Sequence, residues 1–135
     1  FTAGEYKITP IKACHAFEED SLNYIIDDGE KALLYLVDSG YPYEETLDFI
    51  NNYGKKFDCV VMDATMGDSY YKGHMNHDEN KKLKEYLISS GACDKSSKFI
   101  ITHITHNHTG THEYVEKIFA GSGIEVSYDG YRIKF

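Results

Sequence analysis

The stretch FIITHITHNHTGTHEYVEKI (residues 99–118) contains four of the seven histidines in this chain of 135 residues. The apolar run at its start predicts a short buried strand at 98–102, and the segment at 113–120 predicts a helix. His103 follows the strand directly. We therefore expect this histidine at one edge of a sheet, in a loop that joins a strand to a helix.

Strands and helices alternate on both sides of this stretch. We expect strands at 6–14, 22–27, 32–37, 57–62, 98–102, 124–128 and 131–135, and helices at about 43–53, 77–90 and 113–120. Asp129-Gly130 is a strong signal for a hairpin between the last two strands. This order predicts an α/β layer, a mixed and mostly antiparallel sheet with helices on one face. The other face would be apolar, so we expect something to cover it.

Composition excludes several classes of protein. The formal net charge is -8, and no cluster of Lys and Arg stands out, which disfavours a nucleic-acid partner. No apolar run approaches the ~20 residues that a membrane-spanning helix needs. The three cysteines are widely spaced and odd in number, which favours a reducing, cytoplasmic location. A small anionic substrate stays compatible with the acidic surface if metal ions hold it.

Three residues at the ends of predicted strands are candidate metal ligands: His15, Asp38 and His103. Strand ends on one edge of a sheet converge, and two histidines with a carboxylate suit Zn²⁺ or Mn²⁺. A carboxylate can also bridge two cations. His74, in the loop before the second helix, is a fourth candidate. Taken singly, a histidine after a strand is usually a surface or hydrogen-bonded residue, and an aspartate before Ser-Gly is typical of a turn.

Five stretches, in family order, resemble the second half of metallo-β-lactamase-superfamily hydrolases. They are ITPIKACH (8–15), LLYLVDSGY (33–41), GHMNHDE (73–79), the histidine-rich stretch at 99–118, and VSYDGYRI (126–133). They are most similar to the phosphonate-pathway cyclic phosphodiesterases, with ribonuclease Z as a more distant relative. The resemblance implies that residues 1–135 are the C-terminal half of a metallo-β-lactamase-like αββα sandwich. The N-terminal half, with its HxHxDH motif, is absent from the sequence.

The resemblance also implies a role for each candidate residue. His15 resembles the third histidine of the first metal site, Asp38 the aspartate that bridges both metals, and His103 the last histidine of the second metal site. His74 is similar to the family histidine that assists the scissile phosphate, either by protonating the leaving oxygen or by stabilising developing charge.

Three further histidines lie in or beside the same loop. The resemblance implies that His106 and His108 shape the mouth of the substrate site, although the residues themselves favour a structural role for both and for His112. The run His106-x-His108-x-x-x-His112 does not replace HxHxDH, because its spacing ends one residue late and Gly110 stands where the aspartate belongs.

The implied function is that of a metal-dependent hydrolase. We expect a phosphodiesterase that cleaves small, often cyclic, phosphoesters with water activated by two divalent ions, Zn or Mn. The missing N-terminal half, or a homo-oligomer partner, would complete the site. A non-catalytic half-domain acting as an interaction or structural module is the alternative. A tRNA 3′-end endonuclease is a further one, but only 22 residues (16–37) separate His15 from Asp38, which leaves no room for that family's substrate-clamping arm.

Overall fold

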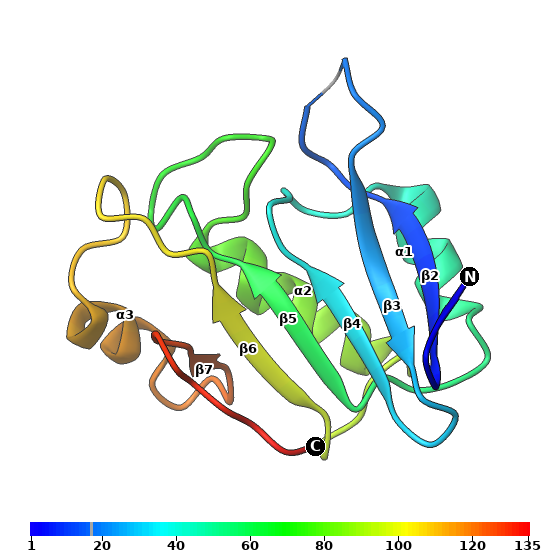
Figure 1. Ribbon diagram of the computed structural model, residues 1–135. Helices are drawn as coiled ribbons and strands as arrows, with labels where there is room; N and C mark the ends of the chain where they lie inside the picture. Colours follow the sequence, from blue (N-terminus) through cyan, green and yellow to red (C-terminus); the bar gives the residue numbers. More distant parts are fainter. Residues whose placement is uncertain (17) are drawn as a thin grey trace.

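A computed structural model describes residues 1–16 and 18–135 as one mixed sheet with three helices (Figure 1). The strands are β1 (Thr2–Ala3), β2 (Tyr6–Lys12), β3 (Leu22–Asp27), β4 (Ala32–Leu36), β5 (Cys59–Asp63), β6 (Lys98–Thr102) and β7 (Glu125–Val126). The helices are α1 (Glu44–Asn51), α2 (His77–Ser89) and α3 (His112–Phe119). The predicted α/β layer is confirmed. None of these helices has the length and apolar character that crossing a membrane requires.

The strands lie in the sheet in the order in which they occur along the chain. Pairing is antiparallel from β1 to β4 and parallel from β4 to β7. Because β2 and β4 are both antiparallel to β3, they run in the same direction as each other and as β5 and β6. The carboxyl ends of these four strands therefore meet at one edge of the sheet.

The core lies on the face that α1 and α2 cover, behind the sheet in Figure 1. One cross-strand row on this face is almost completely buried and consists of Ile25, Leu34, Val60 and Phe99. Helix α2 contributes Leu83 and Leu87, which are spaced four residues apart and are fully buried. A capping box between Asn76 and Glu79 starts this helix within one residue of its predicted position.

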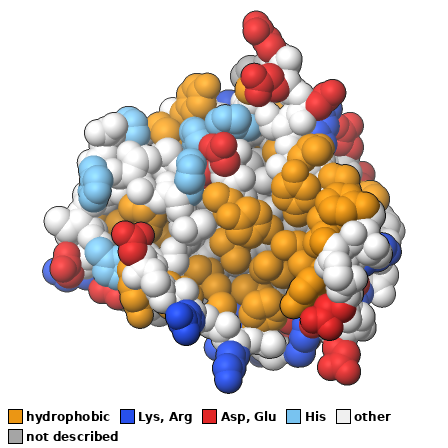
Figure 2. Space-filling view, viewed as in Figure 1, with side chains coloured by type: hydrophobic (Ala, Val, Ile, Leu, Met, Phe, Trp, Pro, Cys, Tyr) orange, Lys and Arg blue, Asp and Glu red, His pale blue; other side chains and the backbone are white. Residues whose placement is uncertain are grey.

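The opposite face of the sheet is apolar, as expected. Tyr24, Tyr35 and Val61 form one cross-strand row on it, and Tyr35 remains 38% exposed. Figure 2 shows hydrophobic side chains gathered over the centre of this face, where β3, β4 and β5 lie in Figure 1. This face is the apolar sheet face referred to below.

The predicted hairpin at Asp129-Gly130 is wrong. Strand β7 pairs in parallel with β6, and residues 127–135 form no strand. The amide of Tyr131 instead donates to the carbonyl of Tyr128, which closes a turn. The parallel pairing prevails because the edge of β6 offers free backbone groups, and helix α3 provides the crossover that a parallel neighbour requires.

Candidate metal centre

Asp38 stands at the centre of the residues that the sequence singles out. Its Oδ1 atom lies 3.9 Å from His15 Nε2, 3.9 Å from His103 Nε2 and 3.8 Å from His74 Nδ1. The ring centroids of His15 and His74 are 4.9 Å apart, and the ring centroids of His74 and His103 are 5.6 Å apart. The fold thus brings together four side chains from positions 15, 38, 74 and 103 at one edge of the sheet.

The two predicted histidine ligands present the same ring nitrogen to Asp38. His15 Nδ1 lies 3.1 Å from the carbonyl oxygen of Gly73. A carbonyl only accepts hydrogen bonds, so this nitrogen carries the proton and Nε2 keeps its lone pair. The Nε2 lone pair is what a metal ion binds, and it faces the Asp38 carboxylate.

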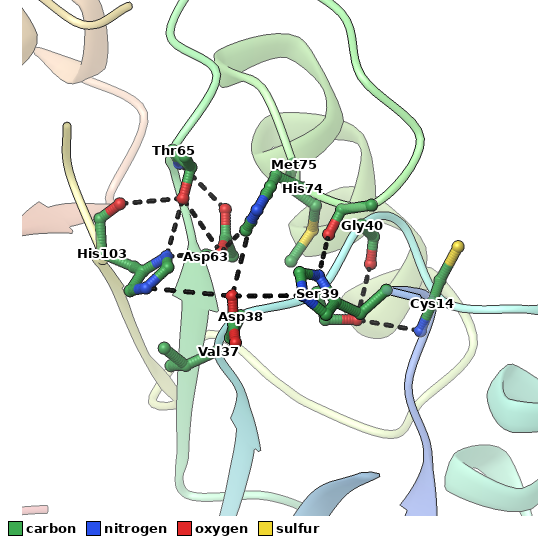
Figure 3. A network of polar contacts seen from close by, with 12 residues as sticks. Cys14, Val37, Asp38, Ser39, Gly40, Asp63, Thr65, His74, Met75 and His103 are labelled. Atoms are coloured by element: carbon green, nitrogen blue, oxygen red, sulfur yellow. Dashed lines mark hydrogen bonds and ion pairs between the residues drawn. The ribbon is translucent and has the colours of Figure 1, made fainter. Parts of the chain in front are cut away.

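Asp63, at the end of β5, completes the cluster and was missed by the sequence analysis. Its carboxylate is fully buried. The Oδ2 atom accepts hydrogen bonds from His74 Nδ1 at 3.1 Å and from His103 Nδ1 at 3.0 Å (Figure 3). One buried carboxylate therefore fixes the orientation of both rings, as carboxylates commonly do for metal-binding histidines. The sequence signal was available, because Asp63 follows a buried strand as Asp38 and His103 do.

Thr65 and Asn80 hold this carboxylate and its surroundings. The amide of Thr65 donates to Asp63 Oδ1 at 2.8 Å, and its hydroxyl donates to the carbonyl of His103 at 2.9 Å. The side-chain amide of Asn80, which is fully buried, donates to the carbonyl of Asp63 at 2.7 Å. Helix α2 and the end of β5 are thereby linked at the cluster, which limits the freedom of both histidines.

Close backbone packing joins the ends of β2 and β4 to the loop before α2. The amide of Gly40 donates to the carbonyl of Cys14 at 2.7 Å, and the amide of Cys14 donates to the buried Ser39 hydroxyl at 3.1 Å. A Cβ atom on Gly40 would lie 1.8 Å from the carbonyl oxygen of Lys72. Glycine is therefore required at position 40, and the segment before His74 packs directly against the chain that follows Asp38.

The donor set and its spacing fit a divalent metal ion. Ligand atoms of Asp38, Asp63, His74 and His103 all lie within 4.8 Å of one another. Metal bonds of about 2 Å allow two ligand atoms up to about 4 Å apart to share one ion. The distances from Asp38 Oδ1 to His15 Nε2 and to His103 Nε2 are both 3.9 Å and satisfy this limit. Asp63 is better placed to orient the histidines than to bind the ion itself, because its carboxylate is buried and already accepts hydrogen bonds from two rings. Asp38 is half exposed and is the better candidate ligand.

His106 and His108 lie elsewhere. Both are exposed in the loop between β6 and α3, and among residues 1–16 and 18–135 no contact joins their side chains to the cluster. The carbonyl of His108 instead packs against Gly67, where an added Cβ atom would lie 2.0 Å from its oxygen. This contact holds the loop against the segment that follows Asp63.

Comparisons with known proteins identify the fold. No protein-family model matches the chain, and no curated protein does. Among solved structures, the metallo-β-lactamase fold protein YhfI from Bacillus subtilis is 22% identical with a TM-score of 0.67, and the match covers 97% of this chain and 49% of that one. This chain has the fold of half a metallo-β-lactamase domain.

Two other solved structures share this fold. A diphosphatase from the PhnP family is 19% identical with a TM-score of 0.69, and the match covers 100% of this chain and 46% of that one. A possible metal-dependent hydrolase from Veillonella parvula is 15% identical with a TM-score of 0.68, at 100% and 56% coverage. The chain thus spans about half the length of the metallo-β-lactamase fold structures it matches.

Proposed function

We propose that this chain belongs to a metal-dependent hydrolase that cleaves small phosphoesters. The observation that carries the proposal is the position of Asp38 Oδ1, at 3.9 Å from the Nε2 atoms of both His15 and His103. A carboxylate between two histidines, each with its other ring nitrogen already bonded, is a donor set for a pair of divalent ions.

His15, Asp38 and His103 are the proposed metal ligands, with Asp38 bridging the two positions. Nitrogen and oxygen donors of this kind suit Zn²⁺ or Mn²⁺. When bound, such ions activate water and neutralise the charge on phosphate oxygens. Asp63 is proposed to orient the ligands without binding metal, because it accepts hydrogen bonds from the Nδ1 atoms of His74 and His103, and His103 then presents Nε2 to Asp38.

His74 is proposed to assist departure of the leaving alcohol. Its Nδ1 atom is bonded to the buried Asp63 carboxylate, so Nε2 is the nitrogen that can reach a substrate. A histidine held in this way can transfer a proton to a leaving oxygen or stabilise developing charge on it. Assistance of this kind suits the release of an alkoxide. The PhnP-family diphosphatase among the similar structures supports phosphoester chemistry, and His106 and His108 are retained as candidates for the substrate mouth.

The complete site needs more ligands than these residues supply. Three protein ligands shared between two ions leave each ion with too few donors for tight binding. We propose that the chain is the C-terminal half of an αββα sandwich, and that its N-terminal half packs on the apolar sheet face and supplies the remaining ligands. The open apolar face and the half-length match to the solved structures support this arrangement. A cytoplasmic location is also proposed, because Cys14, Cys59 and Cys93 are all free and buried.

The decisive experiment uses the protein expressed from its full reading frame, compared with residues 1–135 alone. Bound Zn and Mn are measured by mass spectrometry. Hydrolysis is followed with bis(p-nitrophenyl) phosphate and a 2′,3′-cyclic nucleotide, with a β-lactam and a thioester as controls. We expect the protein from the full reading frame (the long form) to bind about two ions and to cleave the phosphoesters, and we expect chelation of the metal to abolish this cleavage. Residues 1–135 alone (the short form) should bind metal weakly.

The same experiment separates the alternative functions. A long form that purifies and stays without metal when Zn or Mn is added would indicate a non-catalytic interaction or structural module. Cleavage of a tRNA precursor with no cleavage of the small esters would indicate the endonuclease function. Equal metal content and turnover in the long and short forms would contradict the proposal that a second half completes the site.

A further inference from the structure

Tyr71 lies beside the proposed proton donor and is tied to it by the backbone. The amide of His74 donates to the carbonyl of Tyr71 at 3.1 Å, and the two residues form an isolated β-bridge. Their ring centroids are 6.0 Å apart, with an interplanar angle of 36°. The hydrogen-bonded turn between them means that a shift of His74 would move Tyr71 with it.

Gly73 determines where the Tyr71 ring can lie. A Cβ atom at this position would lie 2.8 Å from Tyr71 Cε1 and 3.1 Å from the carbonyl oxygen of His15. The absence of a side chain on Gly73 therefore lets the ring pack close to the backbone, next to the carbonyl that holds His15 Nδ1. The rest of the ring faces outward, and the residue is 53% exposed.

An exposed tyrosine is ordinary by itself, and its neighbour Tyr70 is more exposed, at 71%. Tyr71 differs because it contacts both Gly73 and the ring of His74, whereas in the described part of the chain Tyr70 has no ring contact. The structure thus fixes a large aromatic surface next to one ring of the cluster and leaves part of it open.

We propose that Tyr71 is a specificity-determining residue that stacks on a planar group of the leaving alcohol. The inference rests on the proposed function. In that reaction, the oxygen of water bonds to phosphorus and one water proton leaves to solvent. The bond to the leaving oxygen breaks with its electrons on that oxygen, His74 donates its Nε2 proton there, and a proton from solvent then restores His74. The leaving oxygen must therefore lie within about 3 Å of His74 Nε2.

This geometry places the leaving group next to Tyr71. A ring attached to the leaving oxygen would lie one or two bonds beyond it, within reach of the Tyr71 ring, whose centroid is 6.0 Å from that of the His74 ring. Aromatic rings interact favourably when their centroids are about 4.5–7 Å apart. The substrate class is thus a phosphoester whose leaving alcohol carries an aryl or heteroaryl ring, in preference to one with a small alkyl alcohol.

The test measures binding of two inhibitors, phenylphosphonate and methylphosphonate, to the metal-loaded protein from the full reading frame. Methylphosphonate reports on the metal centre alone, and phenylphosphonate adds the ring. We expect Tyr71→Ala to weaken phenylphosphonate binding roughly two- to tenfold. Binding of methylphosphonate should stay unchanged in this variant, and Tyr71→Phe should bind both inhibitors as the parent does. Tyr70→Ala is the matched control and should also change neither affinity.

Kinetics with bis(p-nitrophenyl) phosphate give a second readout. We expect Tyr71→Ala to raise KM and leave kcat within about twofold, since stacking on the ring contributes to ground-state and transition-state binding alike. Equal loss of affinity for both inhibitors, or no loss for either, would overturn the role of Tyr71 while the hydrolase proposal stands. Failure of the metal-loaded protein to bind methylphosphonate would overturn both.

Discussion

Asp38 and His103 face each other with Oδ1 and Nε2 3.9 Å apart, and both hold their backbones in the left-handed region, with φ of 59° and 60°. They are the only non-glycine residues with positive φ in the part of the chain that the structure describes. This conformation costs an L-residue about 1–2 kcal/mol. Strain of this kind persists at functional sites when the surroundings enforce it. Here Ser39 and Gly40 fix the chain after Asp38, and Thr65 holds the carbonyl of His103.

Two substitutions at position 38 separate strain from ligation. Asp38→Ala and Asp38→Gly both remove the proposed bridging carboxylate, so both should lose bound metal. Glycine adopts positive φ without steric cost, so Asp38→Gly should be more stable to denaturant than Asp38→Ala by about 1 kcal/mol. Urea unfolding of the metal-free proteins measures the difference. Equal stability would mean that position 38 is not strained.

Substitution of His74 should lower turnover, whereas substitution of Asp38 should lower metal content. His74→Ala should leave metal bound and lower turnover by about 10²–10⁴, the usual scale for one general acid. Asp38→Ala should lower metal content itself. Metal analysis alongside steady-state rates of phosphoester cleavage distinguishes the two effects. A rate like that of the parent protein in the His74 variant would remove its assigned role.

Asp63 should control metal affinity without touching the metal. Replacement by asparagine turns one of the two accepting oxygens into an amide donor, which would oppose either the two ring N–H groups at the Oδ2 position or the Thr65 amide at the Oδ1 position. We expect Asp63→Asn to weaken metal binding about 10- to 100-fold, as is typical for partners of metal-bound histidines. Calorimetric titration with Zn²⁺ measures it. Asp78→Asn, an exposed change in the first turn of α2, is the control and should bind as the parent does.

Substitutions at Gly67 and Gly54 test the close contact between the loop after β5 and the loop between β6 and α3. Both have positive φ, at 56° and 85°, but an added Cβ atom meets the carbonyl of His108 at 2.0 Å only at position 67 and meets nothing within 4 Å at position 54. Alanine should therefore be more destabilising at Gly67, by about 1–3 kcal/mol beyond its effect at Gly54. Thermal or urea unfolding tests this. Equal losses would contradict the close approach.

Asp27 should make stability depend on pH in acid. The hydrogen bond from Lys55 is the main cause that lowers the pKa of Asp27 below its ordinary value of 3.8, with further bonds from Gly29 and Tyr53, whereas desolvation by partial burial opposes the shift. The folded state then binds this proton less readily than the unfolded state does. The stabilisation is therefore present above pH 3.8 and is lost as pH falls through the lower folded value.

The measurement for Asp27 is urea unfolding between pH 2 and pH 6. Asp27→Asn should flatten the fall in stability at the acid end of this range, because the side chain no longer titrates. Glu30→Gln, an exposed change in the adjoining turn, is the control and should keep the slope of the parent protein. A parent-like slope in the Asp27 variant would show that other carboxylates carry the acid response.

Local sequence determined the elements and the edge of the sheet where the cluster forms. Apolar runs gave the five strands from β2 to β6 within a few residues, and the helix expected at about 77–90 corresponds to α2. These features depend on side chains close together along the chain, so periodicity and capping suffice to predict them. The candidates His15, Asp38, His74 and His103 followed from strand ends and from a resemblance of motifs in order.

Only the tertiary structure decided the role of Asp63 and the course of residues 127–135. The position of Asp63 after a buried strand indicates only that it lies at the edge of the sheet, and its role appears when β5 lies between β4 and β6 and two distant rings reach its carboxylate. Asp129-Gly130 has the local chemistry of a hairpin, but the free edge of β6 takes β7 in parallel instead. In both cases the outcome depends on contacts between segments far apart in the chain, whose energies no local pattern contains.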